Sequence, residues 1–254
     1  MTTSPASIRA IVTGHTRGLG AALAELLLAR GIRVLGLGRG TNTALAARHH
    51  AALVQTPLDL SDTPAIERWL ATDALRRFTA EAHCVLLFNN AGMVEPIAPC
   101  GAQAADAIAR AVALNVTAPL MLANAVASQA AASPEAERRI VHVSSGAARN
   151  AYAGWSIYCA TKAALDHHAR AVALDAPQGV RICSVAPGVV DTAMQATIRA
   201  TAADQFPSRE RFEQLKQNGQ LATPEAAARQ LVDYALSDAF GSTPTADVRE
   251  LAKA

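Results

Sequence analysis

The chain has 254 residues, of which 51% are hydrophobic and 17% charged, and its 23 Lys and Arg nearly balance its 21 Asp and Glu. This length fits one large α/β domain or two small domains, and the composition excludes a disordered chain, which combines low hydrophobicity with high net charge. Because the Lys and Arg residues are scattered and the net charge is only +2, no nucleic-acid partner is expected.

Short apolar runs rich in Val, Ile and Leu alternate with longer Ala- and Leu-rich segments. In chain order, strands are predicted at 8–13, 33–38, 53–56, 84–89, 140–144 and 180–185, with a further candidate at 246–251. Helices are predicted near 18–30, 42–50, 62–77, 103–132, 156–174 and 223–237. This alternation predicts an α/β fold: a doubly wound, Rossmann-type, mostly parallel sheet in a single domain. The polar stretch 192–220 breaks the rhythm, and we expect it to form a lid.

No targeting or membrane segment is expected. Residues 1–7 are polar, and the most apolar stretch, 116–132, is interrupted by Pro119 and Asn124, so it falls short of the ~20 apolar residues that a membrane span requires. The 4 cysteines form no CxxC pair and no zinc-ligand spacing, so no metal site is expected. They are either disulfides of an oxidising compartment or buried free thiols of a cytoplasmic protein, and we favour the second interpretation.

The first predicted strand runs into a glycine-rich turn, Thr13-Gly14-His15-Thr16-Arg17-Gly18-Leu19-Gly20, and a helix opens at once. Glycines let the backbone approach a pyrophosphate closely, and the helix N-terminus offers free N–H groups. The spacing is GxxxGxG rather than GxGxxG, so a plain tight turn is the alternative. His15 either contacts phosphates or is a residue that Thr or Ala would replace equally well.

The second predicted strand ends in Leu37-Gly38-Arg39. At this position an acidic residue binds the ribose 2′-hydroxyl of NAD, whereas an arginine accommodates a 2′-phosphate. Arg39, with Arg17 as a second guanidinium, therefore predicts NADP(H) as the cofactor. The alternative is that Arg39 is a solvated loop residue.

Further motifs follow along the chain. They are Asn89-Asn90-Ala91-Gly92 after the fourth strand, Leu114-Asn115-Val116 in the next helical region, Ser145 after the fifth strand, Tyr158 and Lys162 one helical turn apart, and Pro187-Gly188 after the sixth strand. With the glycine turn, they make the chain resemble the short-chain dehydrogenase/reductase family over about residues 8–238. The runs 144–148, 154–155 and 187–195 resemble the benzil reductase and sepiapterin reductase branch of that family.

The resemblance implies a catalytic set of Asn115, Ser145, Tyr158 and Lys162. Tyr158 would protonate the carbonyl oxygen as hydride arrives from the nicotinamide, and Ser145, 13 residues earlier, would hydrogen-bond the same oxygen. Lys162 would bind the nicotinamide ribose and lower the pKa of Tyr158. Asn115 would shape its helix and support a water near Lys162.

The chemistry of a general acid gives an independent reason for this set. An unperturbed tyrosine titrates near ~10, and moving its pKa to about 7 takes roughly 4 kcal/mol of preference for the phenolate. The Lys162 ammonium and an oxidised nicotinamide would supply that preference. A general acid works best with its pKa near the operating pH, so we expect the pKa of Tyr158 to be lowered.

The resemblance also implies where the cofactor and the substrate bind. The cofactor-binding residues would be Gly14, Arg17, Gly18, Leu19, Gly20, Arg39, Asp59, Leu60, Asn89, Ala91, Gly92, Tyr158, Lys162, Pro187, Gly188, Val190 and Thr192. Trp155, Met194 and Gln195 either line a substrate pocket or pack the loop against the core. Pterin reductases of the branch hold the pterin with an acidic residue near the C-terminus, so Asp247 or Glu250 is a hypothetical substrate contact.

These observations predict a cytoplasmic, NADPH-dependent carbonyl reductase that acts on a small diketone, an aromatic ketone or a pterin-like dicarbonyl. The alternatives are a 3-oxoacyl thioester reductase or hydroxysteroid-type dehydrogenase and, outside enzymes, a non-catalytic NADP(H)-binding regulator. The C-terminal run from Asp247 argues against the thioester reductase, and the intact catalytic set argues against the regulator. In the family, the counterparts of the Ala-rich helices 103–132 and 156–174 form subunit interfaces, so a homodimer or homotetramer is expected.

Overall fold

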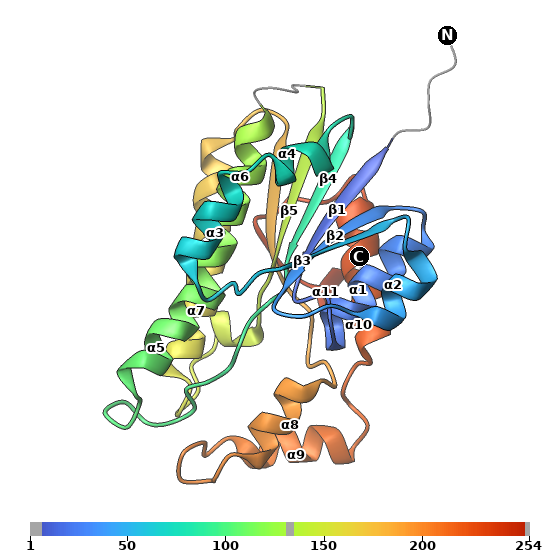
Figure 1. The fold of residues 1–254 in the computed structure, drawn as a ribbon. Coiled ribbons are helices and arrows are strands. Elements are labelled where there is room, and N and C mark those ends of the chain that lie inside the picture. The colour runs from blue at the N-terminus through green and yellow to red at the C-terminus, as the bar shows by residue number, and fades with distance from the viewer. Residues whose placement is uncertain (1–6, 131–134, 252–254) are drawn as a thin grey trace.

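A parallel sheet forms the centre of the computed structural model, which describes residues 7–130 and 135–251. Its strands are β1 (Ile8–Thr13), β2 (Arg33–Gly38), β3 (Leu53–Pro57), β4 (Cys84–Asn89), β5 (Glu137–Val143), β6 (Val180–Ala186) and β7 (Thr245–Asp247). They lie in the order β3-β2-β1-β4-β5-β6-β7, and each neighbouring pair runs parallel (Figure 1). The order switches between β1 and β4, which is where open parallel sheets bind their ligands.

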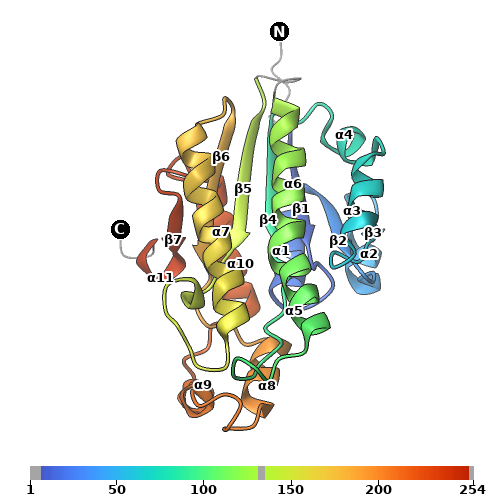
Figure 2. The same ribbon diagram turned by 90° about the vertical axis from the view of Figure 1, so that its left-hand side faces the viewer.

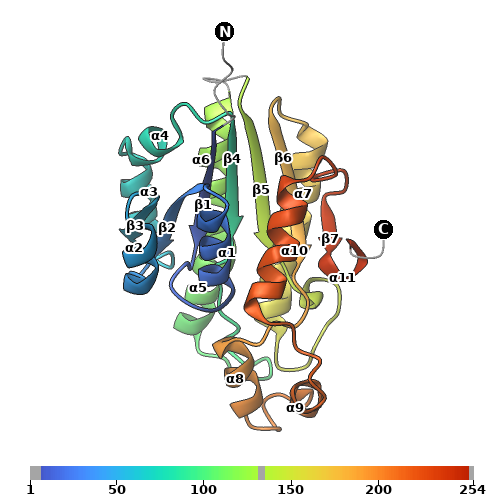
Figure 3. The same ribbon diagram turned by 90° about the vertical axis from the view of Figure 1, so that its right-hand side faces the viewer.

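Helices cover both faces of the sheet. One face carries α1 (Gly18–Ala29), α2 (Thr43–His49) and α10 (Pro224–Leu236) (Figure 3). The other carries α3 (Thr63–Leu70), α4 (Ala74–Thr79), α5 (Ala105–Val112), α6 (Ala118–Ala127) and α7 (Ser156–Asp175) (Figure 2). Because helices shield both sides, all 6 residues of β4 are buried, as expected for a parallel sheet between two helical layers. The predicted doubly wound α/β fold is confirmed.

Several element boundaries differ from the prediction. Strand β5 begins at Glu137 rather than at residue 140, because Arg139 is neutralised within the strand by Glu137 at 2.8 Å and donates to the Ala235 carbonyl. Because charged residues at the start of a strand look like part of a loop in the sequence, the predicted strand began too late. The predicted helix 62–77 is two helices, α3 and α4, because the Thr72 hydroxyl donates to the Trp69 carbonyl and accepts the Ala74 N–H. The candidate strand 246–251 ends at Asp247 and continues as α11 (Val248–Leu251).

The predicted helix 103–132 consists of α5, a π-helical turn at Ala113–Thr117, α6 and a 3₁₀ turn at Ser128–Ala130. By length and composition, its stretch 105–127 would be able to cross a membrane. Leu122 and Val126 on its inner side belong to the apolar core beneath β4 and β5. The stretch therefore covers the sheet, and its outer side remains exposed at Val112.

The segment 192–220 contains α8 (Ala193–Ala200) and α9 (Arg209–Gln217), beyond the carboxyl ends of the strands (Figure 1). Its two ends are tied together at the sheet, because Ala222 donates its N–H to the Val189 carbonyl and accepts the Asp191 N–H, both at 2.9 Å. The two ends of the segment therefore lie side by side next to the end of β6.

Candidate active site

A cleft of about 940 Å³ opens along the carboxyl edge of the sheet. The glycine turn and the ends of β2 and β4 form one end of its wall, and the ends of β5 and β6 with the first turn of α8 form the other. Except for Asn89, the predicted cofactor-binding residues line it: Gly14, Arg17, Gly18, Leu19, Gly20, Arg39, Asp59, Leu60, Ala91, Gly92, Tyr158, Lys162, Pro187, Gly188, Val190 and Thr192.

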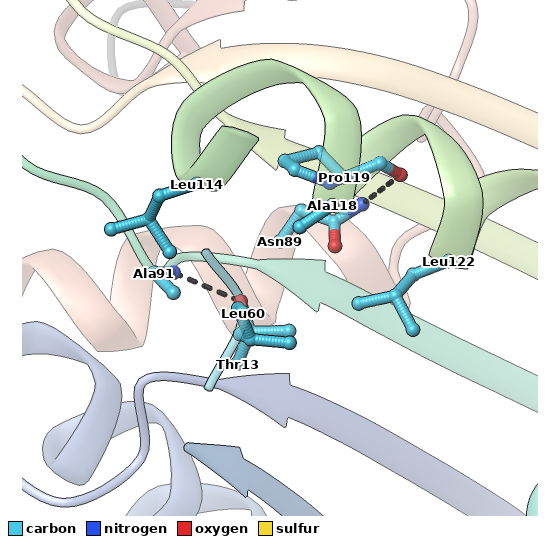
Figure 4. Close-up of a pocket in the computed structure, with 8 residues that line it drawn as sticks. All are labelled: Thr13, Leu60, Asn89, Ala91, Leu114, Ala118, Pro119 and Leu122. Carbon is cyan, nitrogen blue, oxygen red and sulfur yellow. Dashed lines mark hydrogen bonds between the residues drawn. The ribbon is translucent and has the colours of Figure 1, made fainter. Parts of the chain in front are cut away.

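The glycine turn is held tightly against the end of β4. The Thr13 hydroxyl accepts the N–H groups of Asn90 and Ala91, each at 2.9 Å (Figure 4 shows the bond to Ala91). A Cβ on Gly20 would overlap the Gly14 carbonyl oxygen, so only glycine fits there. Helix α1 begins next to this turn with neither a side-chain cap nor an acidic residue in its first turn. Its first N–H groups are therefore available to an anion such as a pyrophosphate.

His15 lies under the turn and away from the cleft. Its ring is fully buried, and its Nε2 lies 2.7 Å from Oε1 of Gln55 on β3. A Cβ on Gly36 would overlap the ring, so the bare backbone of β2 makes room for it. Of the two interpretations of His15, the structure supports the one without a phosphate contact.

Arg17 and Arg39 lie exposed on the same end of the cleft. Within residues 7–130 and 135–251, neither guanidinium forms an ion pair. Arg39 is close enough to Asp59 to lower the pKa of that carboxyl, although hydrogen bonds from Ser61 lower it more. This end of the cleft thus offers guanidinium groups that a phosphate can engage.

Helix α7 presents Tyr158 and Lys162 on its buried face, one turn apart. The Lys162 Nζ donates to the Val143 carbonyl at 2.8 Å and lies 5.8 Å from the centre of the Tyr158 ring. Ser145 lies two residues after the end of β5; its hydroxyl accepts the Ala147 N–H at 3.1 Å, and it is close enough to Tyr158 to oppose the rise in the pKa of that side chain. The three side chains therefore converge on the middle of the cleft.

Asn115 lies behind these residues in the π-helical turn. Its amide exchanges two hydrogen bonds with the Met93 backbone, at 2.8 and 2.9 Å, and donates to the Thr161 hydroxyl at 3.2 Å. A Cβ on Gly92 would lie 3.3 Å from its Oδ1. Asn115 thus ties the loop after β4 to α7, and the π turn is the kind of helical irregularity often found at functional sites.

Burial dominates the electrostatics of the site. It lowers the pKa of Lys162 to about 8, against the opposing attraction of Asp166. It raises the pKa of Tyr158, against the hydrogen bond with Ser145. The expected lowering of the Tyr158 pKa is therefore not produced by the chain's own groups, because the effect of burial outweighs that of Ser145.

Asn89 does not line the cleft, which corrects its predicted ribose contact. Its amide is buried beneath α6, where it donates to the Pro119 carbonyl at 3.2 Å (Figure 4) and lies 3.2 Å from Nδ1 of His142. Its neighbour Asn90 lines the cleft instead and donates to the Thr13 carbonyl. Adjacent side chains along a strand face opposite sides, which separates the two asparagines. The other ring nitrogen of His142 lies 3.0 Å from Nδ1 of His168.

Trp155, Met194 and Gln195 all line the cleft. Trp155 stacks on Phe206 with the ring centres 4.4 Å apart and packs edge-on against Tyr158. Within the described residues, the Trp155 Nε1 donor and the Gln195 Oε1 acceptor are buried without a hydrogen-bond partner. Tyr152, Phe206 and Phe212 complete this aromatic cluster and were not predicted. Aromatic residues make up only 4% of the sequence, so their concentration in 152–155 and 206–212 could have been used to predict this cluster.

The acidic residues near the C-terminus do not reach the cleft. Asp247 is buried and holds Arg249, with both carboxylate oxygens engaged at 2.6 and 2.9 Å. Glu250 is exposed on α11. Arg249 lines the cleft instead, whereas Asp247 and Glu250 are not among the residues that line it. The reason is that β7 pairs with β6 and turns Asp247 inward.

The tight turn, the uncapped start of α1 and the guanidinium groups at the end of β2 suit a dinucleotide that extends along the cleft to Lys162. With Tyr158 and Ser145 beside that end, fold and site define a Rossmann-type oxidoreductase dependent on a nicotinamide nucleotide. The chain belongs to the short-chain dehydrogenase/reductase family, since the family model described as short chain dehydrogenase matches residues 9–203.

Curated relatives and a solved structure agree with this assignment. The chain is 37% identical to a benzil reductase ((S)-benzoin forming) of Bacillus subtilis (strain 168) over 226 residues, which cover 87% of this chain and 90% of that protein. It is 30% identical to a sepiapterin reductase of Xenopus tropicalis over 254 aligned positions, 93% of this chain and 94% of that one. The crystal structure of a short-chain dehydrogenase/reductase from Burkholderia vietnamiensis is 57% identical, with a TM-score of 0.70 over 98% of this chain and 100% of that one.

Proposed function

We propose that the protein is an NADPH-dependent carbonyl reductase that converts a small diketone, an aromatic ketone or a pterin-like dicarbonyl into the alcohol. The observation that carries the proposal is the meeting of Ser145, Tyr158 and Lys162 in the middle of the cleft, next to the aromatic wall at Trp155. The similarity to benzil and sepiapterin reductases supports the same class of substrate.

In this proposal, bound NADPH supplies the hydride to the carbonyl carbon. Tyr158 donates its hydroxyl proton to the carbonyl oxygen, so that hydride and proton together complete the alcohol. Ser145 donates a hydrogen bond to the same oxygen and stabilises the negative charge that develops on it. The raised pKa of Tyr158 keeps its proton in place before the reaction. Lys162 holds a ribose hydroxyl and returns a proton toward Tyr158.

The preference for NADPH over NADH is part of the proposal. It is supported by Arg39 and Arg17, whose guanidinium groups line the cleft. Gly38 and Gly40 flank Arg39 on the wall and leave room for a phosphate. A bidentate guanidinium fork matches a 2′-phosphate and gains little from a 2′-hydroxyl.

A homodimer or homotetramer in the cytoplasm is also proposed. The outer side of the helical stretch 105–127 exposes Val112, and α7 leaves Leu174 87% exposed, so a second copy would bury apolar surface there. The described thiols are unpaired, as in a reducing compartment. Light scattering of the purified protein in solution should give two or four times the mass of one chain. The mass of a single chain would overturn the proposal that the protein assembles.

The activity is tested by following the absorbance of reduced nicotinamide with NADPH or NADH and one of four substrates: benzil, sepiapterin, an aryl monoketone and an acetoacetyl thioester. Oxidation of NADPH with benzil, sepiapterin or the monoketone supports the proposal. Turnover of the thioester alone would replace it with the thioester reductase, and a preference for NADH would overturn the role of Arg39. Binding of NADPH without turnover of any substrate would favour a regulator.

A further inference from the structure

The wall of the cleft beyond the aromatic cluster is positively charged. Arg211 projects from α9, its guanidinium carbon lies 5.8 Å from the centre of the Tyr152 ring, and its Nη1 donates to the Tyr152 hydroxyl at 3.3 Å. Tyr152 in turn packs against Trp155, with the ring centres 5.2 Å apart. Since Trp155 contacts Tyr158, Arg211 lies near the reacting end of the cleft.

A second guanidinium, that of Arg249, lies on the same part of the wall. Asp247 grips it through Nε and Nη2 and fixes its orientation. Its Cδ would lie 3.8 Å from a Cβ on Gly188, which places it next to the Pro187-Gly188 turn. The hydrogen bonds that Arg249 donates to Asp247 are the main cause of its raised pKa, and the nearby Tyr152 contributes. Arg211, Tyr152 and Arg249 therefore form one cluster, which we call the cationic wall.

Of the two arginines in the cationic wall, Arg249 is paired with Asp247, whereas the carboxylates in contact with the cleft do not neutralise Arg211. Asp59 lies at the opposite end, near Arg39. Glu95, on the loop after β4, lines the cleft but makes no ion pair with Arg211 or Arg249. Across residues 7–130 and 135–251, Arg211 has no carboxylate within ion-pair distance, whereas Arg110, another cleft arginine, is paired with Asp106 at 3.0 Å. Arg211 is thus free to bind an anion.

We propose that the substrate is an oxo acid, a ketone that also bears a carboxylate, and that Arg211 binds this carboxylate with Arg249 beside it. The inference rests on the proposed function, because it names the substrate of that same cleft. Guanidinium groups bind carboxylates through paired, charge-assisted hydrogen bonds. The aromatic residues between Tyr158 and Arg211 would pack against the apolar part of the substrate. The oxo acid, NADPH and one proton would yield the hydroxy acid and NADP⁺.

The kinetic test compares phenylglyoxylate with its neutral methyl ester, which keeps the same ring and ketone. For the native enzyme we expect kcat/KM to be at least about tenfold higher for the acid, the size of a charge-assisted hydrogen bond. Arg211→Gln should remove about tenfold to hundredfold of kcat/KM for the acid, mainly through KM, and much less for the ester. Arg211→Lys should restore part of it. Arg229→Gln, an exposed arginine of α10 outside the cleft, is the matched control.

A binding measurement separates failure of this inference from failure of the proposed function. Calorimetric titration of mandelate and of mandelamide, with NADP⁺ present, reports recognition of the carboxylate without turnover. Tighter binding of mandelate, lost in Arg211→Gln and weakened by added salt, supports the cationic wall even if no ketone is reduced. Equal binding of the two compounds, or an unchanged mandelate affinity in folded Arg211→Gln, would overturn it, while reduction of the neutral ester would leave the carbonyl reductase intact.

Discussion

At the scale of single residues, the site depends on side chains that α7 buries. Tyr158 keeps its proton because burial disfavours the phenolate, and Lys162 carries an ammonium group under the same penalty. A general acid and a cation in one buried site need specific partners to hold them in place. Ser145 is that partner for Tyr158, and the Val143 carbonyl and the Asp166 carboxylate serve Lys162.

Replacement of Tyr158 by Phe should remove the proton donor and leave the shape of the cleft nearly unchanged. We expect kcat to fall by about 10²- to 10⁴-fold, the usual contribution of a general acid, while the NADPH dissociation constant stays within about threefold because the ribose contacts remain. Stopped-flow turnover and fluorescence titration measure the two quantities. Turnover of the Phe variant close to that of the native enzyme would show that the proton comes from elsewhere.

Asp166, on the same helix as Lys162, favours the ammonium form of that lysine and is itself held by several partners. It is buried and accepts hydrogen bonds from the hydroxyls of Ser144 at 2.6 Å and Ser184 at 2.7 Å. Arg149 pairs with it at 3.3 Å. It therefore joins β5, β6 and the turn after Ser145 to the helix that carries Lys162, so it is a positioning residue.

The pH dependence follows from the pKa of Lys162, which burial lowers to about 8 while Asp166 opposes that lowering. Reduction requires the ammonium form, so kcat/KM should fall as the pH rises through about 8. Asp166→Asn removes the attraction and lowers the pKa of Lys162 further, so the alkaline limb should move to lower pH. The neighbouring groups that bear on this titration are Tyr158 on α7 and His142 on β5.

Asp175→Asn, on the exposed end of the same helix, is the control for that shift and should leave the alkaline limb in place. Asp166→Asn should also lower the free energy of unfolding by about 1–3 kcal/mol, because buried hydroxyls and Arg149 lose an ionised partner. Denaturant unfolding measures this loss. A loss of stability without any shift of the pH profile would mean that Asp166 holds the fold together and has no effect on Lys162.

At the scale of elements, the segment 192–220 gains its position from contacts with the loop before α7. Phe206 is fully buried against Trp155, and the Gln205 carbonyl rests on Gly154 so closely that a Cβ there would overlap it. Gly154 also has a φ of +83°, in the region that favours glycine. The contact between Gly154 and the Gln205 carbonyl therefore sets how closely α8 and α9 approach the cleft.

Gly154→Ala should therefore displace the segment from the aromatic cluster. Gly101→Ala is a matched control, because Gly101 has a φ of +96° but open space around its Cα. We expect both variants to lose about 1 kcal/mol from the positive φ, and only Gly154→Ala to raise KM for an aryl ketone and to speed proteolysis within 192–220. Identical KM values and cleavage rates in the two variants would show that the segment is not docked through Gly154.

At the scale of the whole molecule, a dinucleotide would bridge elements that are far apart in the sequence. The end of β2 with Arg39, the turn before α1 and the ends of β5 and β6 share one cleft. Any ligand that binds the folded chain alone raises the free energy of unfolding, by about 2.7 kcal/mol at a hundred times its Kd. The thermal stability of the whole chain therefore reports on cofactor choice.

NADPH at that saturation should raise the Tm by roughly 5–10 °C, given about 2–4 °C per kcal/mol for a domain of this size. Arg39→Ala should lose much of the shift with NADPH and keep that with NADH, because only the 2′-phosphate needs the guanidinium. Arg68→Ala, an exposed arginine of α3, serves as the control. Equal Tm shifts with NADPH and NADH in the native protein would contradict the assigned role of Arg39.

The parts of the site that were predictable are those in which local chemistry and position coincide. Tyr158 and Lys162 are one helical turn apart, so any helix through them places both on one face. The glycines of the turn and Arg39 follow strand ends, which parallel pairing brings to one edge of the sheet. The choice of Asn89 was off by one residue: adjacent side chains face opposite sides, and only the tertiary structure shows that Asn90 is the one that faces the cleft.

The sequence by itself determined the alternation of strands and helices, the parallel sheet and the spacing of Ser145, Tyr158 and Lys162, because each of these depends on short-range periodicity. The tertiary structure alone decided that Phe206 packs on Trp155, that Asp247 forms an ion pair with Arg249, and that Arg211 donates a hydrogen bond to Tyr152. These contacts join residues from different loops and helices, and their side chains pack only after the sheet has brought those segments together.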